Sequence, residues 1–149
     1  MERVEVLGWV LMLDREATRA IYSRIESGGA AECGCAYCLN FLAVRDRHVP
    51  PALTAVLRKL EIDPQKDLEV VEYAPDQART RLYSATYYVV GQLLDGERSL
   101  RDPQEIAPGF SIGLESGAAM YLIDEWRGVP IVTVEWFGRL PWVLDERPG

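Results

Sequence analysis

The chain has 149 residues and a formal net charge of −7, and 48% of its residues are hydrophobic. This length fits a single domain, residues 1–149, which can bury a core without a metal ion or disulfide to hold it together. The acidic balance argues against a nucleic-acid partner, because phosphates repel a negatively charged protein, and it favours a basic protein partner. No apolar run approaches the roughly 18 residues of a membrane span, so no membrane partner is expected.

The N-terminal part of the chain predicts a strand followed by a helix. The apolar pattern of residues 4–13 is typical of one buried strand of about ten residues. Glu2 and Glu5 stand where a secretory signal would carry positive charge, so we expect a cytoplasmic protein. Asp14 is a good helix N-cap, and apolar residues at helical spacing then predict a helix over 14–27, although part of this segment also alternates like a strand.

The three cysteines of the chain lie within six residues, in the stretch ECGCAYCLNF. A helix that begins near Cys35 would place Cys35, Cys38, Leu39 and Leu42 on one apolar face. Free cysteines commonly pack in such a face as small hydrophobic residues. We therefore favour an interpretation in which Cys35 and Cys38 are buried, reduced and inert, and Cys33 lies just ahead of the helix.

The same cysteines leave two chemical alternatives open. Cys33, Cys35, Cys38 and His48, the only histidine, make a Cys₃His set of the kind that zinc accepts, and Glu32 could take the place of the histidine. Alternatively, Cys35 and Cys38 form a C-x-x-C pair at a helix N-terminus, where the helix dipole favours a thiolate and hence redox chemistry. No βαβ pattern of the thioredoxin type precedes the pair, which weighs against the redox alternative.

The middle of the chain predicts a second helix. Pro50 and Pro51 mark its start, and apolar residues at i, i+3, i+4 and i+7 spacing extend it to Leu60. We expect this apolar stripe to pack on the sheet, with Leu57 near its centre.

The second half of the chain changes to strand-like patterns. A polar turn is expected at 75–78, a mobile loop with two prolines at 97–109, and a hairpin turn at 127–128. Alternating and β-branched residues predict strands over 68–73, 82–94, 110–114, 118–125 and 129–137. Early helices and late strands together favour an α+β fold with a mainly antiparallel sheet and two or three helices from the N-terminal half.

The stretch from Cys33 to Phe41 resembles a Cys-x-Cys-x-x-Cys-x-Asn-Phe motif found in a set of small uncharacterised bacterial proteins. These proteins are also similar in a proline-led helix, matched here by residues 50–60. They share a tyrosine-rich strand that ends in a glycine, matched by residues 83–91. The resemblance implies a bacterial protein of the same kind, and it implies no particular activity.

Nothing in the sequence identifies a catalytic residue. A Gly-rich phosphate loop, an H-E-x-x-H motif and a G-x-S-x-G motif are all missing, so an enzyme is not the favoured class, and no cofactor other than zinc is considered. We expect a binding or interaction module, and the alternative is a metal-binding or thiol-dependent enzyme centred on the cysteines. The candidates for a ligand or partner surface are Tyr37, Asn40, Tyr83 and Tyr87.

Overall fold

The computed structural model describes residues 1–149 except for 78–79, 96–101, 119–121 and 146–149. Its strands are β1 (Glu2–Val6), β2 (Trp9–Leu13), β3 (Glu69–Gln77), β4 (Thr80–Asp95), β5 (Gln104–Ala107), β6 (Phe110–Ser116) and β7 (Ile131–Pro141). In the described part of the chain these seven strands form one sheet with the order β1-β2-β4-β7-β6-β5, and β3 pairs with β4 as well. All the strand pairs are antiparallel, which confirms the predicted α+β class with a mainly antiparallel sheet.

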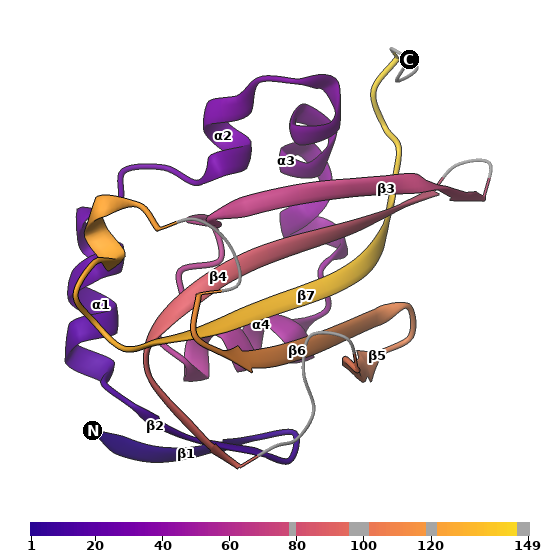
Figure 1. The fold of residues 1–149 in the computed structure, drawn as a ribbon. Helices are drawn as coiled ribbons and strands as arrows, with labels where there is room; N and C mark the ends of the chain where they lie inside the picture. The colour runs from indigo at the N-terminus through magenta and orange to yellow at the C-terminus, as the bar shows by residue number, and fades with distance from the viewer. Residues whose placement is uncertain (78–79, 96–101, 119–121, 146–149) are drawn as a thin grey trace.

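The helices lie behind the sheet and beside its left and upper edges (Figure 1). They are α1 (Arg15–Arg24), α2 (Gly29–Cys33), α3 (Ala36–His48), α4 (Pro51–Lys59) and a 3₁₀ helix over Asp124–Trp126. Figure 1 shows α3 and α4 behind the sheet and α1 at its left end. Among the helices of the described residues, none has the length and apolar character needed to cross a membrane.

The first apolar segment is a hairpin and not the single strand predicted over 4–13. β1 pairs with β2 so that Val6 lies opposite Trp9. The two residues between them, Leu7 and Gly8, have φ angles of 48° and 91°. Two-residue hairpin turns need positive φ at such positions, and Asn-Gly is their usual signature. Leu-Gly carries no such signature, so hydrophobic periodicity alone missed the turn.

Helix α1 begins where the sequence predicts, because the Asp14 carboxylate accepts a hydrogen bond of 2.9 Å from the backbone N–H of Ala17. It ends at Arg24, earlier than the predicted end at residue 27. One edge of β4 pairs with β2 near its C-terminal end and with β3 near its start. Between these two partners, α1 lies against β4 in place of a strand.

Side chains of α1 satisfy the backbone groups of β4 in this gap. The Thr18 hydroxyl oxygen accepts a hydrogen bond of 3.0 Å from the Val90 N–H. The Tyr22 hydroxyl donates to the Tyr88 carbonyl at 2.7 Å. Buried backbone groups need such partners, so these two side chains let α1 replace a strand at the centre of the sheet.

We expect Tyr22→Phe to lower the free energy of unfolding by about 1–3 kcal/mol, because the buried Tyr88 carbonyl would lose its partner. Urea denaturation measures this change. The control is Ser23→Ala, which removes an exposed hydroxyl on the same helix and should cost less than about 0.5 kcal/mol. Equal stability of the two variants would show that the Tyr88 carbonyl finds another partner.

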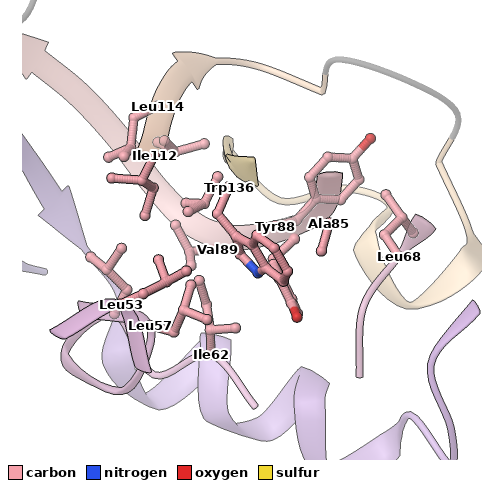
Figure 2. Close-up of a cluster of buried hydrophobic side chains, with 14 of the residues drawn as sticks. Leu53, Leu57, Ile62, Leu68, Ala85, Tyr88, Val89, Ile112, Leu114 and Trp136 are labelled. Carbon is pink, nitrogen blue, oxygen red and sulfur yellow. The ribbon is translucent and has the colours of Figure 1, made fainter. Parts of the chain in front are cut away.

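Helix α4 confirms the predicted proline-led helix. Pro50 is its N-cap, and Leu53 and Leu57 are 0% and 1% exposed. Figure 2 shows these two leucines pointing toward Ile112 and Trp136 of the sheet. The apolar stripe therefore packs on the sheet as expected, and Leu53 and Leu57 belong to the core.

Leu57→Ala should lower the free energy of unfolding by about 2–5 kcal/mol, the usual range for a buried leucine. The matched control, Arg58→Ala, changes an exposed residue of the same turn, and its effect should stay below about 0.5 kcal/mol. Chemical denaturation compares the two. A small effect of Leu57→Ala would place the wrong face of α4 on the sheet.

The strands predicted over 68–73, 82–94, 110–114 and 129–137 are confirmed as β3, β4, β6 and β7, with changed ends. Two predicted connections differ from the structure. The turn expected at 75–78 does not begin at residue 75, because β3 continues to Gln77. The loop expected at 97–109 contains the short strand β5, and its residues 97–101 lie outside the described part.

The strand predicted over 118–125 is wrong in its described part. Its C-terminal end enters the 3₁₀ helix, and Trp126 is only 2% exposed. The Trp126 ring packs edge-on against Tyr22 and Tyr88, with centroid distances of 5.4 and 5.7 Å. This burial turns the chain toward α1. The residues before 127 therefore do not pair with β7 in the predicted hairpin, and the partners of β7 are β4 and β6.

Candidate metal centre

The three cysteines converge in space. The Sγ atoms of Cys33, Cys35 and Cys38 all lie within 4.8 Å of one another. Cys33 is the last residue of α2, and Gly34 follows with a left-handed φ of 73°. Cys35 is the N-cap of α3, and Cys38 lies in the first turn of that helix. The left-handed glycine thus turns the chain between the two helices and brings the sulfur atoms together.

The three thiols differ in their exposure to solvent. Cys38 is 6% exposed and belongs to the core, whereas Cys33 and Cys35 are exposed. The prediction of two buried cysteines is therefore right for Cys38 and wrong for Cys35. Leu39 is 49% exposed, because the buried face of α3 runs through Cys38, Phe41 and Val44 and not through Leu39.

The helix terminus also distinguishes the thiols electrostatically. The Cys35 sulfur accepts a hydrogen bond of 3.4 Å from the Cys38 backbone N–H, and this contact lowers the pKa of Cys35. Burial raises the pKa of Cys38 far above its usual range. A bound cation would favour the thiolate form of all three cysteines, because coordination displaces the thiol proton.

The spacing of the sulfur atoms suits a zinc ion. Zinc–sulfur bonds of about 2.3 Å in a tetrahedron place neighbouring sulfur atoms roughly 3.8 Å apart. The observed separations of up to 4.8 Å reach this value with shifts of about an ångström or less per side chain. Cys33 and Cys35 are exposed, so their side chains have room for shifts of this size.

His48 does not join this cluster. It is the last residue of α3, ten residues after Cys38, which is roughly 15 Å along the helix axis. Glu32, the predicted substitute, shares a hydrogen bond of 3.1 Å with Ser27. The structure therefore does not assemble the predicted Cys₃His set, and among the described residues the cluster contains three ligands.

A buried amide fixes the start of α3. Asn40 is 0% exposed, and its Nδ2 donates to the Pro141 carbonyl at 3.0 Å and to the Tyr83 hydroxyl at 3.3 Å. Its Oδ1 accepts from the Val143 N–H at 2.8 Å. The Tyr83 hydroxyl in turn donates to the Tyr37 carbonyl at 2.9 Å. These bonds join the first turns of α3 to β4, to the last residue of β7 and to the segment that follows it.

This network corrects the predicted ligand or partner surface for Asn40 and Tyr83, whereas Tyr87 lines a cavity beside the end of α1. Asn40, Tyr83 and Tyr87 are each 0% exposed, so they do not form an exposed surface. The Tyr87 hydroxyl donates to the Pro64 carbonyl at 2.7 Å. Buried tyrosines commonly satisfy their hydroxyls in this way while their rings fill the core. Tyr37 is the half-buried member of the set, and its ring contacts the Arg81 guanidinium at 5.5 Å.

A buried ion pair links α2 to α3, and sequence reasoning missed it. Asp67 is 3% exposed, and its carboxylate accepts from the Ala30 N–H at 3.0 Å. Arg45 of α3 approaches the same carboxylate at 3.7 Å. Charged residues are usually exposed, so nothing in the sequence separates Asp67 and Arg45 from other surface charges. The pair matters here because α2 carries Cys33.

Comparisons of the chain with protein-family models, with curated proteins and with solved structures found no match. The chemistry of the cysteine cluster and its surroundings therefore supplies the functional conclusion.

Asn40→Ala should lower the free energy of unfolding by about 2–4 kcal/mol, because several buried polar groups would lose their partner at once. It should also speed the reaction of the Cys38 thiol with an alkylating reagent in the native protein. The control is Leu39→Ala, which changes the neighbouring exposed side chain and should do neither. Slow Cys38 alkylation in Asn40→Ala would show that the amide does not hold the cluster in place.

Proposed function

We propose that the protein binds one zinc ion through Cys33, Cys35 and Cys38. The observation that carries the proposal is the convergence of the three sulfur atoms within 4.8 Å. Thiolates are ligands that zinc prefers, and three protein ligands are enough when water or a substrate fills the fourth position. The proposal takes up the metal-binding part of the alternative that the sequence left open. The favoured interpretation, a binding or interaction module with a basic partner, stays a prediction.

Hydrophobic packing accounts for only one of the three cysteines. Cys38 lies in the core, so its burial needs no chemical explanation. Cys33 and Cys35 are exposed and gain nothing from the hydrophobic effect, yet they converge on Cys38. A shared ligand explains why two exposed thiols and one buried thiol meet at one point.

The predicted position of the fourth ligand follows from the exposure of the cluster. The buried thiol of Cys38 lies on the inner side, and Cys33 and Cys35 lie toward solvent. A metal ion held by these three sulfur atoms would therefore keep its fourth position on the solvent side. That position would admit water or a donor atom from a substrate, as in zinc sites with three protein ligands.

The proposal predicts one metal ion per chain in titrations of the reduced protein. Cobalt is a suitable spectroscopic substitute, because Co²⁺ bound to thiolates gives intense sulfur-to-metal charge-transfer bands. Zinc affinity is then measured by displacement of Co²⁺. Cys33→Ser and Cys35→Ser should each reduce this affinity by more than the roughly 10–100-fold that is typical when only a supporting residue is lost.

His48→Ala is the matched control and should leave the affinity unchanged, because His48 lies at the far end of α3. Cys33 and Cys35 are exposed, so their serine variants should fold, and the test does not depend on the buried Cys38. The absence of charge-transfer bands in the reduced protein would refute the proposal. Loss of binding in His48→Ala would refute the ligand set.

A further inference from the structure

A second candidate site is a cavity of about 470 Å³ beside the end of α1. Figure 1 shows the 3₁₀ helix (orange) lying over the C-terminal end of α1, next to the chain that leads into α2. Residues from all three helices and from β4 line the cavity. Its volume falls within the roughly 300–1,000 Å³ typical of small-molecule sites.

Four of the fifteen residues that line the cavity are aromatic, and each is at most 4% exposed: Tyr22, Tyr87, Tyr88 and Trp126. The planes of Tyr22 and Tyr88 stand at 76° and 86° to the plane of Trp126, and all three residues line the cavity. The Tyr22 hydroxyl is fixed on the Tyr88 carbonyl, so this wall is rigid before any ligand binds. The aliphatic part of the lining consists of Ile25, Leu68 and Ile123.

Carboxylates outnumber cations around the same cavity. The acidic lining residues are Glu26, Glu32, Asp67 and Glu125, against Arg24 and Lys66. The Lys66 ammonium group donates to the Tyr22 carbonyl at 2.7 Å and lies 4.0 Å from the carboxylate of Asp63, which is not part of the lining.

The unpaired charge at this cavity is negative. Glu26 and Glu125 take part in none of the salt bridges found among the described residues. Asp67 is 3% exposed, and its Oδ1 accepts no hydrogen bond in the described part of the chain, although it lies 3.7 Å from the Arg45 guanidinium. Arg24 is the one cation of the lining that takes part in none of the salt bridges among the described residues.

We propose that this cavity binds a small organic cation with an apolar body, such as an arylalkylammonium ion. The apolar body fits the aromatic and aliphatic wall, and burying it there is favourable. The ammonium group is attracted by the carboxylates of Glu26 and Glu125. A neutral analogue lacks this attraction, and a carboxylate of the same shape is repelled.

Three probes of nearly equal shape test the charge preference: 2-phenylethylamine, 2-phenylethanol and 3-phenylpropionate. Isothermal titration at low salt should show binding of the amine, binding of the alcohol at least about tenfold weaker, and no binding of the carboxylate. Equal binding of amine and alcohol, preference for the carboxylate, or no binding of the amine at millimolar concentration would overturn the proposal.

Charge variants test the location. Glu26→Gln and Glu125→Gln should each weaken amine binding by about fivefold, the effect of one carboxylate near a cation in a well-hydrated site, and leave alcohol binding unchanged. Glu16→Gln makes the same change in net charge at an exposed position of α1 outside the lining, and should leave both unchanged. Equal effects of the three substitutions would show a general charge effect and overturn the assigned site.

Two further measurements locate the bound amine without the charge variants. In an NMR titration of the unmodified protein, the amine should shift the indole N–H signal of Trp126. Ile25→Trp should fill the cavity and abolish binding of both amine and alcohol, while the folded spectrum is retained. Shifts confined to other tryptophans would contradict the assignment. Cys33→Ser should bind the amine normally, so this proposal and the zinc proposal fail separately.

Discussion

The position of the cysteine cluster depends on one buried amide, that of Asn40. A polar side chain at 0% exposure is costly unless its hydrogen bonds are made inside the protein. Asn40 makes them with the Pro141 carbonyl, the Tyr83 hydroxyl and the Val143 N–H. These partners come from both ends of the second half of the chain, so the first turns of α3 have one favourable position against the sheet.

The buried pair of Asp67 and Arg45 has a comparable effect on α2. Asp67 holds the first N–H groups of this short helix through its carboxylate and its own carbonyl, which accepts from Gly29 at 2.8 Å. A five-residue helix has little stability of its own, so its place depends on such contacts. We interpret the contact between Asp67 and Arg45 as fixing geometry more than adding stability, since buried ion pairs often contribute little net free energy. Together the contacts of Asn40 and Asp67 set where Cys33 meets the two cysteines of α3.

The sequence predicts those parts of the fold that depend on local patterns. Helix α4 follows from Pro50 and the leucine spacing, because capping and amphipathic periodicity act within a few residues. The hairpin at Leu7 and Gly8 was missed, because a leucine with positive φ gives no local signal. The 3₁₀ helix at Trp126 was also missed, because burial of that ring against distant tyrosines overrides local strand propensity.

The candidate site shows the same division between local and tertiary information. The sequence places Cys33, Cys35 and Cys38 near one another, and their convergence then depends on the left-handed Gly34 and on Cys35 acting as an N-cap. The apolar stripe predicts the burial of Cys38 correctly and fails for Cys35, because the pattern does not show where the helix begins. His48 entered the ligand set as the only histidine, and the length of α3 keeps it apart.

X-ray absorption spectroscopy of the zinc-loaded protein tests the central claim most directly, because it reports the atoms around the metal. The account predicts three sulfur neighbours at about 2.3 Å and one lighter oxygen or nitrogen donor at about 2.0 Å, without the outer-shell scattering of an imidazole ring. A first shell without sulfur, or with the imidazole signature of His48, would contradict a metal centre built from Cys33, Cys35 and Cys38.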